Sequence, residues 1–373
     1  MRRSRVLVAG ATGLVGKAMA EHLLANDEAD VIALSRREPH LPGATHVACD
    51  LTKPTECASL LSGLEGITDI VFGALYEKPD LIAGWRDPEQ MAVNRAMLAN
   101  LLDAVEPSSP ALRHIAILQG TKAYGVHVEP ITVPAKERWP RHDHENFYWL
   151  QEDLIRERQS LGNGWSYSVW RPQALLGNAL GSPMNLVGAL GAWAAIRREQ
   201  GKPLSYPGGG NLVTAATDTR LLAEAIWWGC NADTAQNETF NVINGDVLVW
   251  PHIFHCIADV FGMQIADAAE ERLEETMPAH EELWAHMVQK YDLRRHTLAE
   301  WIGSSWQFTD RSLATGIAHP APSVLSPVKL NRRLHKNDRY GREYRLVVAP
   351  IAARALAASL NPVPSCGGNA CRA

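Results

Sequence analysis

The 373-residue sequence has no apolar run of the roughly 18 residues that a membrane-spanning helix requires. Three arginines lie within the first five residues, as in the charged start of a signal peptide. The apolar run behind them covers only residues 6–9 before a glycine turn, which is too short for the core of such a peptide. These absences predict a protein that neither crosses a membrane nor is secreted, and we expect it in the cytoplasm.

The sequence also lacks an excess of basic charge, because 36 Lys and Arg stand against 41 Asp and Glu, a net charge of -5. Electrostatic binding of nucleic acid requires a clear basic excess, so we expect no nucleic-acid partner. None of the six cysteines lies in a CxxC pair. Tetrahedral zinc sites usually take ligands from such close pairs, so the sequence predicts reduced thiols and no metal site.

The first half of the chain alternates short apolar runs with longer amphipathic stretches. Strand-like runs cover residues 5–9, 30–34, 45–48, 69–72, 114–118 and 167–169, and apolar residues at helical spacing cover 13–24, 89–105 and 147–159. Short apolar strands between helices are typical of a parallel sheet covered on both faces. The sequence therefore predicts an α/β fold with a Rossmann-type, doubly wound parallel sheet.

The pattern changes after about residue 172. Helices are expected at residues 186–198, 219–230 and 250–261, a strand at 239–243, and a charged helical stretch at 267–291. Most of the 12 tryptophans lie in this half, where they suit either a pocket for an apolar ligand or ordinary helix packing.

These patterns divide the chain into three parts. We expect a sheet-forming domain over residues 1–175, to which some later segments return. A smaller, mostly helical part should cover residues 176–330. Residues 331–373 are expected to form a basic, low-complexity and disordered tail, with a short helix at 352–360.

A glycine-rich segment between the first expected strand and helix is the sharpest local signal. It reads Gly10-Ala11-Thr12-Gly13-Leu14-Val15-Gly16. Gly10 allows a tight turn, Gly13 lets backbone N–H groups approach a pyrophosphate, and Gly16 lets the helix lie close to the strand. The segment predicts a dinucleotide site formed by Gly10, Thr12, Gly13, Leu14, Val15 and Gly16.

The end of the second expected strand selects between the two nicotinamide cofactors. An NAD site has an acidic residue there, which accepts a hydrogen bond from the ribose 2′-hydroxyl. This sequence has Ser35, Arg36 and Arg37 instead, so no carboxylate would repel a 2′-phosphate. Two guanidinium groups and a hydroxyl can bind that phosphate. The sequence predicts NADPH, against the alternative that both arginines only solvate a loop.

Residues after the third and fourth strands extend the expected cofactor site. Asp50 and Leu51 follow the third strand, where they would meet the adenine edge. Gly73, Ala74 and Leu75 follow the fourth strand, where backbone would line the cofactor.

Two side chains predict a reaction centre at the carboxyl edge of the sheet. Tyr148 begins a helix at a place where many short-chain reductases have Tyr-x-x-x-Lys, but the fourth position after it is Glu152. A carboxylate there would disfavour a tyrosinate, because like charges repel. Lys122 follows the fifth strand, so we expect its ammonium to point into the same crevice as Tyr148.

Five segments together resemble the progesterone 5β-reductase/iridoid synthase family of atypical extended short-chain reductases, over residues 6 to about 328. They are Gly-Ala-Thr-Gly-Leu-Val-Gly, Ser-Arg-Arg, Gln-Gly-Thr-Lys-Ala-Tyr, Glu-Asn-Phe-Tyr-Trp-Leu-Gln-Glu-Asp and Asn-Val-Ile-Asn-Gly-Asp. The resemblance implies NADPH-dependent conjugate reduction of the C=C bond of an enone or enal, such as a 3-oxo-Δ4-steroid or a smaller activated alkene.

The same resemblance implies roles for individual residues and a quaternary state. Lys122 and Tyr148 would be the catalytic pair. Residues that would bind the cofactor include Gln119, Gly120, Tyr148, Pro172 and Ala174. The partner would be a small apolar enone, and the chain would form a homodimer.

Two other functions stay open on the sequence. A carbonyl reductase or sugar-nucleotide epimerase would need a tyrosine that transfers its proton, usually with a lysine where this chain has Glu152. A non-enzymatic NADP(H)-sensing regulator would need only the glycine loop. From Asn331 the chain is basic and polar, unlike the apolar closing segment of the family, which leaves the substrate open.

Overall fold

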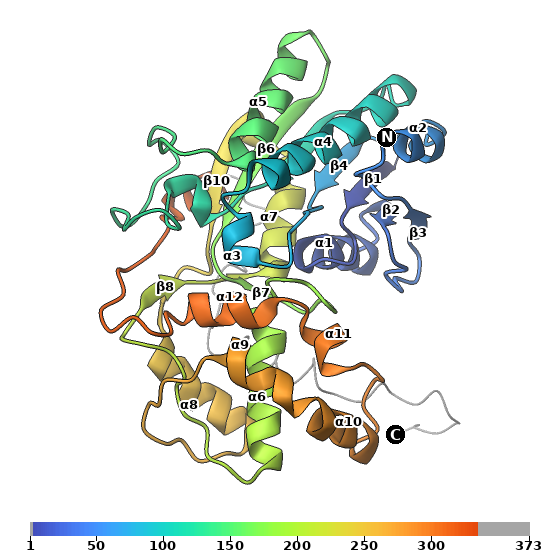
Figure 1. Cartoon of the computed structure of the whole chain (residues 1–373). Coiled ribbons are helices and arrows are strands. Elements are labelled where there is room, and N and C mark those ends of the chain that lie inside the picture. The colour runs from blue at the N-terminus through green and yellow to red at the C-terminus, as the bar shows by residue number, and fades with distance from the viewer. Residues whose placement is uncertain (1–2, 335–373) are drawn as a thin grey trace, which may run out of the picture.

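The computed structural model describes residues 3–334, and this part of the chain is built around a seven-stranded parallel sheet (Figure 1). The strand order is β10-β6-β5-β4-β1-β2-β3. Their bounds are β1 Ser4–Ala9, β2 Ala29–Ser35, β3 Thr45–Ala48, β4 Asp69–Phe72, β5 His114–Leu118, β6 Ser166–Pro172 and β10 Glu238–Val242. Because the order reverses between β1 and β4, the sheet is doubly wound. The predicted Rossmann-type fold is confirmed.

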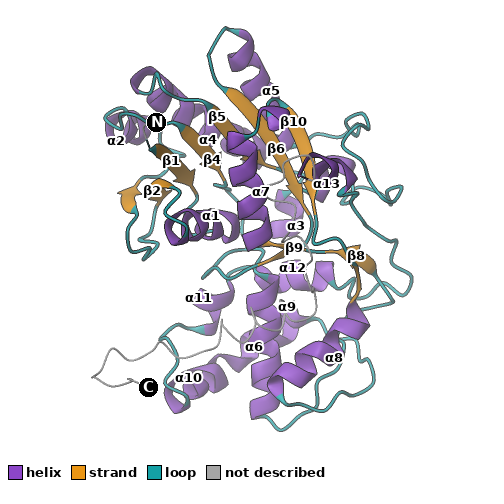
Figure 2. Ribbon diagram, turned by 180° about the vertical axis from the view of Figure 1, so that it is seen from behind, coloured by secondary structure: helices purple, strands orange, loops and turns teal. Residues whose placement is uncertain are grey.

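Helices cover both faces of this sheet. Helices α1 (Leu14–Ala25) and α7 (Thr219–Asn231) pack together on one face (Figure 2). Helices α2 (Pro54–Leu61), α4 (Pro88–Val105) and α5 (Phe147–Ser160) cover the other. Successive strand residues point to opposite faces, and both faces are buried, so the central strands are apolar along most of their length.

A second core lies beyond the carboxyl edge of the sheet, in the lower part of Figure 1. Its helices are α6 (Leu186–Glu199), α8 (Trp250–Phe261), α9 (Leu273–Thr276), α10 (Glu281–Lys290), α11 (Leu298–Ile302) and α12 (Ser305–Ser312). Two short strand pairs connect it to the sheet. They are β7 (Leu175–Leu176) with β9 (Thr217–Asp218) and β8 (Val213–Ala215) with β11 (Val247–Val249).

One helical prediction in this part is wrong. The stretch 267–291 is not continuous, because helix begins only at Leu273 and a 3₁₀ turn over Met277–His280 separates α9 from α10. The carboxylate of Asp310 accepts hydrogen bonds from the N–H groups of Leu273 and Glu274, which starts α9 at that point. Pro278 lacks the N–H group that a continuous helix needs.

The last described segment returns to the first part of the molecule. Helix α13 (Val328–Leu334) buries Leu330 and Leu334 in the core beneath α7. The boundary expected at Asn331 therefore falls inside a helix, because the sequence signal was dominated by its exposed basic face. The rest of the expected tail, and the helix expected at 352–360, lie outside the described residues.

No helix within residues 3–334 is long and apolar enough to cross a membrane. Over the same range, no group of three or more His, Cys, Asp or Glu side chains is arranged to hold a metal ion. Four of the six cysteines lie in this range, and all four are free thiols.

A buried asparagine on α4 holds the loop that follows β4. Asn94 accepts a hydrogen bond from the N–H of Tyr76 at 2.9 Å and donates to the carbonyl oxygen of Tyr76 at 2.9 Å. Its side chain is inaccessible to solvent. Since this loop borders the site described below, Asn94 supports the site through the backbone.

Replacing Asn94 with Ala should lower the free energy of unfolding by about 2 kcal/mol, because it leaves the part-buried N–H and carbonyl of Tyr76 without their partner. Urea denaturation measures the change. Asn163→Ala, at an exposed loop position, is the control and should change stability by less than about 0.5 kcal/mol. Equal transition midpoints for the two variants would show that Asn94 does not brace this loop.

Candidate active site

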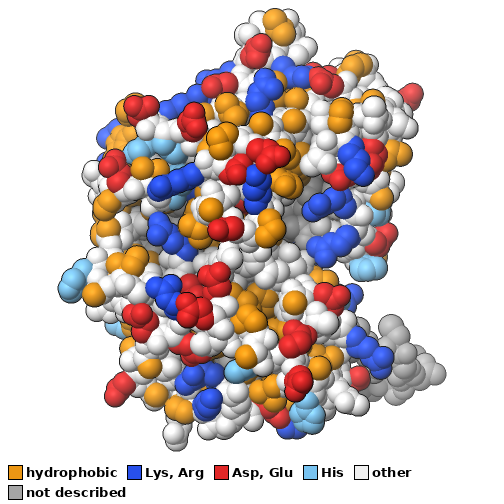
Figure 3. Space-filling model, in the orientation of Figure 1, with side chains coloured by type: hydrophobic (Ala, Val, Ile, Leu, Met, Phe, Trp, Pro, Cys, Tyr) orange, Lys and Arg blue, Asp and Glu red, His pale blue; other side chains and the backbone are white. Residues whose placement is uncertain are grey.

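A cavity of about 930 Å³ lies along the carboxyl edge of the sheet, between the two cores (Figure 3). One end is lined by residues that follow β1, β2 and β3, and the other by residues of α8, α12 and the segment before α13. Of the residues predicted for the site, all but Gly16 line this cavity. They are Gly10, Thr12, Gly13, Leu14, Val15, Ser35, Arg36, Arg37, Asp50, Leu51, Gly73, Ala74, Leu75, Gln119, Gly120, Lys122, Tyr148, Pro172 and Ala174.

The glycine turn after β1 forms the floor of one end. Gly10 has a φ of 82°, and a Cβ there would lie 2.8 Å from the backbone nitrogen of Ala74. Gly16 does not line the cavity. It lets α1 pack closely against the turn, since a Cβ on it would lie 2.2 Å from the carbonyl oxygen of Gly10. Gly13 precedes α1 without a capping side chain, so the first N–H groups of the helix lack intrahelical partners. This cradle fits an anionic pyrophosphate.

Ser35, the last residue of β2, and the two arginines that follow it have three different roles. The hydroxyl of Ser35 donates to the carbonyl oxygen of Arg37 at 2.7 Å, which shapes the turn. The guanidinium of Arg37 donates to the carbonyl oxygen of Leu180 at 3.2 Å and so connects the sheet to the second part of the molecule. Arg36 makes no side-chain hydrogen bond or ion pair with any residue between 3 and 334, and it lines the cavity. The guanidinium of Arg36 is therefore available to a ligand.

The structure brings Lys122 and Tyr148 together at the middle of the cavity. Lys122 lies in a 3₁₀ turn (Thr121–Tyr124) after β5, and Tyr148 lies in the first turn of α5. The Nζ of Lys122 is 5.7 Å from the centroid of the Tyr148 ring. Asn146 connects the two elements, because it accepts from the N–H of Tyr148 at 3.0 Å and donates to the carbonyl oxygen of Lys122 at 3.4 Å.

Aromatic rings surround the Lys122 ammonium. Its Nζ lies 4.3 Å from the centroid of the Trp85 ring and 5.7 Å from that of Phe147. Within the described part of the chain it has no hydrogen bond and no ion pair. Cation–π attraction therefore holds the ammonium in place and leaves its three N–H donors available to a ligand.

The hydroxyl of Tyr148 is also available. A Cβ at Gly120 would lie 3.3 Å from this oxygen and 3.5 Å from the carbonyl oxygen of Pro172. Glycine at position 120 therefore leaves room beside the hydroxyl, which makes no hydrogen bond to any described residue.

A sequence profile of the NAD dependent epimerase/dehydratase family matches residues 6–242, from β1 to the end of β10. The chain belongs to this family. Its glycine cradle, parallel sheet and first-turn tyrosine of α5 all lie within the matched range.

Two curated relatives narrow the position of the chain in the family. It is 32% identical over 314 residues to (S)-8-oxocitronellyl enol synthase of Antirrhinum majus, with 78% of each chain covered. It is 31% identical over 329 residues to 3-oxo-Delta(4,5)-steroid 5-beta-reductase of Arabidopsis thaliana, with 82% of each covered. The resemblance to the progesterone 5β-reductase/iridoid synthase family is confirmed.

Solved structures of other enzymes share the fold. RMD from Pseudomonas aeruginosa complexed with NADPH matches with a TM-score of 0.62 and 16% identity, covering 95% of this chain and 98% of that one. UDP-glucose 4-epimerase from Thermus thermophilus in complex with NAD matches with a TM-score of 0.62 and 17% identity, covering 95% and 100%. At such identities the likeness establishes the fold alone.

The carboxylate whose charge raises the pKa of Tyr148 is not Glu152, the one expected from the sequence. Glu152 does not line the cavity. It accepts hydrogen bonds from Gln119 at 3.0 Å and from Arg156 at 2.8 Å. Burial alone would raise the pKa of Glu152, but these hydrogen bonds and the nearby charges of Arg141 and Arg171 bring it below its usual value.

Glu77, in the loop after β4, is the carboxylate that sequence reasoning missed. One of its oxygens accepts from Nε2 of Gln90 at 2.6 Å, and the indole N–H of Trp85 also interacts with this buried carboxylate. Burial and the charge of Glu77 together raise the pKa of Tyr148. Tyr148 is therefore a hydrogen-bond donor at neutral pH. In the sequence, the one signal for Glu77 was that it follows β4, a strand of the parallel sheet.

The Lys122 ammonium is easier to deprotonate than an ordinary lysine. Burial lowers the pKa of Lys122 from 10.5 to about 8, and the charge of Glu77 opposes part of this effect. Below about pH 8 the ammonium predominates, so at neutral pH the cavity holds a cation beside a neutral phenol.

The pH dependence of Lys122 modification tests this electrostatic balance. Only the free amine reacts with an amine-selective acylating reagent, so modification of Lys122 should rise with pH and reach half its maximum near pH 8. Glu77→Gln removes a charge that stabilises the ammonium, so the midpoint should move to lower pH. Mass spectrometry of the peptide containing Lys122 measures the fraction modified.

The matched control is Glu89→Gln, which removes a carboxylate that pairs with Lys78 on the surface of α4. This variant should leave the Lys122 midpoint where it is. A midpoint that does not respond to Glu77→Gln would show that the carboxylate and the ammonium are not coupled.

Proposed function

We propose that the protein is an NADPH-dependent oxidoreductase that reduces the C=C bond of an enone or enal by conjugate addition. The observation that carries the proposal is the pairing of a buried ammonium, Lys122, with a protonated phenol, Tyr148, between a dinucleotide cradle and an apolar cavity. The two curated relatives, named as an enol synthase and a steroid 5-beta-reductase, support it.

The cradle after β1 and the free guanidinium of Arg36 support NADPH as the cofactor. The N–H groups at the start of α1 would bind the pyrophosphate, and Arg36 would bind the 2′-phosphate. RMD from Pseudomonas aeruginosa, with the same fold, is complexed with NADPH. When bound, NADPH supplies the hydride.

Tyr148 and Lys122 would stabilise the charge that develops on the substrate. Addition at the β-carbon of an enone puts negative charge on the carbonyl oxygen, and the Tyr148 hydroxyl would donate a hydrogen bond to this oxygen. The Lys122 ammonium would add positive potential at the same place. Water would then protonate the α-carbon, so neither residue needs to lose its proton.

This chemistry explains why position 152 need not be lysine. A carbonyl reductase needs a tyrosine that gives up its proton, and a nearby lysine makes that easier. Here burial and Glu77 raise the pKa of Tyr148, which opposes proton loss and favours hydrogen-bond donation. The apolar part of the cavity, with Trp85, Phe147, Trp250 and Phe308, supports a substrate with an apolar body, such as a 3-oxo-Δ4-steroid or a smaller alkene.

Replacing Tyr148 with Phe should lower turnover of a cyclic enone about 10²–10³-fold, because one donor to the developing oxyanion is lost. NADPH oxidation measures turnover, and product analysis identifies the reaction. A saturated ketone indicates conjugate reduction, whereas an allylic alcohol indicates carbonyl reduction. Tyr291→Phe, on the surface of the second part, is the control. Unchanged turnover in Tyr148→Phe would remove the hydroxyl from the reaction.

Replacing Arg36 with Ala should lower kcat/KM for NADPH by about tenfold and leave that for NADH nearly unchanged, because a charge-assisted hydrogen bond to the 2′-phosphate is lost. Steady-state kinetics with both cofactors measure the ratio. Arg198→Ala, at an exposed position on α6 outside the cavity, should leave the ratio of kcat/KM for NADPH to that for NADH unaltered. An equal loss with both cofactors would exclude 2′-phosphate recognition by Arg36.

A further inference from the structure

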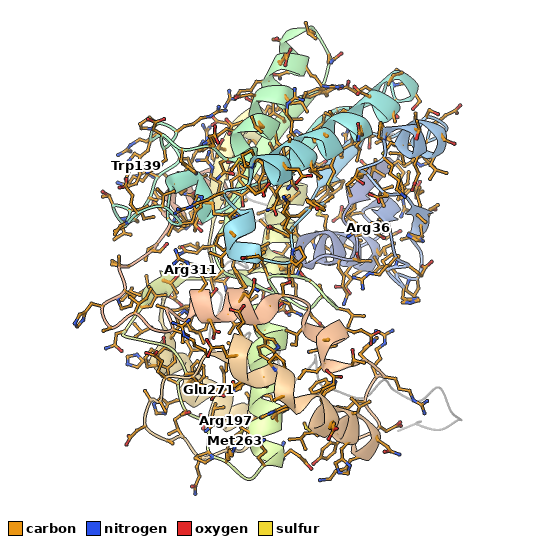
Figure 4. All side chains as sticks on the ribbon, in the orientation of Figure 1. Arg36, Trp139, Arg197, Met263, Glu271 and Arg311 are labelled. Atoms are coloured by element: carbon orange, nitrogen blue, oxygen red, sulfur yellow. The ribbon has the colours of Figure 1, made fainter. Side chains whose placement is uncertain are left out.

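We infer that the substrate carries an anionic group, such as a carboxylate, which is bound by His127, Arg86 and Arg311 at the end of the cavity opposite the cofactor cradle. The inference rests on the proposed function, since it names the substrate class for the same cavity. Arg36 and Arg311 lie on opposite sides of the molecule between its upper and lower parts (Figure 4), and both line the cavity.

The buried imidazole of His127 makes no side-chain hydrogen bond to any residue from 3 to 334. Only 8% of the residue is exposed, and it lines the cavity in the loop after β5. Its Nδ1 is buried without a partner, and Nε2 makes no hydrogen bond to any of the described residues. Among the described rings, those of Trp85 and His144 contact it in edge-type geometry, with centroids 6.4 Å and 4.9 Å away. An imidazole left in this state is costly unless a ligand or water satisfies it.

Positive charge converges on this imidazole from three elements. Arg86, after helix α3 (Leu81–Gly84), lines the cavity and donates to the carbonyl oxygen of His127 at 2.8 Å. Lys122 comes from the turn after β5, and Arg311 from α12. Burial, followed by the charges of His144, Lys122, Arg86 and Arg311, lowers the pKa of His127 to about 3. The imidazole is therefore neutral, and one of its nitrogens can donate a hydrogen bond.

Within residues 3–334 no carboxylate pairs with Arg86 or Arg311 at the cavity surface, whereas the charge of Glu77 acts on Lys122. The two carboxylates that line the cavity there are Asp50, at the cofactor end, and Glu129, which contacts Nε2 of His142 at 3.1 Å. The guanidinium of Arg311 makes no hydrogen bond or ion pair in the same range. By contrast, Arg141 is paired with Glu152. An unpaired cation at the cavity edge is suited to an anion on the ligand.

Both parts of the molecule contribute to this anion site. Gln307 on α12 accepts a hydrogen bond from the N–H of Leu81 at 3.0 Å, which holds α12 beside the segment that carries Arg86. Phe308, on the same helix as Arg311, lines the cavity, as does Trp250 of α8. The cavity combines Tyr148, apolar side chains and the anion site. It therefore fits a substrate with an apolar body and an anionic end, with the enone placed at Tyr148.

Two cyclic enones that differ only in a carboxylic acid against its methyl ester test the inference. In the wild-type protein kcat/KM for the acid should exceed that for the ester by at least about tenfold, mainly through KM. Arg311→Gln should remove most of this preference by slowing the acid alone. Arg311 is exposed, so this substitution should not disturb folding. Arg95→Gln, an exposed position on α4 outside the cavity, should keep the preference.

A binding measurement separates this inference from the proposed function. Calorimetric titration of the NADPH-loaded protein with the saturated acid and the saturated ester requires no turnover. In the wild type the acid should bind about tenfold more tightly than the ester. In Arg311→Gln the two should bind with similar affinity. Selective acid binding without reduction of any enone would uphold the anion site and overturn the reductase. Reduction of both enones with equal kcat/KM, and equal binding of their saturated forms, would overturn the anion site alone.

Discussion

Parallel pairing of the strands is the constraint on which the rest of the structure depends. In a parallel sheet every strand ends at the same edge, so the residues that follow β1, β2, β4, β5 and β6 meet there although they are far apart in sequence. The glycine turn at Gly10 and the loop after β4 touch at this edge, with no room for even one added methyl group. The cavity is the space that remains between this edge and the second core.

Within that cavity, burial sets the protonation of the two central groups. Aromatic rings around Lys122 replace the water that an exposed ammonium would have, and its pKa falls to about 8 as a result. The same burial, with the charge of Glu77, raises the pKa of Tyr148. The pair therefore provides a cation and a neutral donor at neutral pH, a combination suited to stabilising an anion rather than to removing a proton.

Arginine side chains line the cavity at both of its ends. Arg36 and the N–H groups of α1 make one end suited to phosphates, whereas Arg86 and Arg311 make the other end positive as well. Apolar side chains such as Phe147 and Trp250 line the cavity too, so a ligand needs apolar surface besides its charge. A ligand at the second end would contact both cores, since Arg86 follows the sheet domain's α3 and Arg311 belongs to α12.

The sequence by itself determined the sheet, the glycine cradle, and Lys122 and Tyr148 as neighbours, because these depend on local apolar periodicity and on the common edge of parallel strands. Homodimer formation and cytoplasmic location remain predictions. Only the tertiary structure decided that Glu77 rather than Glu152 acts on Tyr148, that Asp310 and Pro278 divide the stretch 267–291, and that Arg311 reaches the cavity. Each of these results depends on contacts between segments distant in the chain, and local pattern carries no information about which distant charges meet.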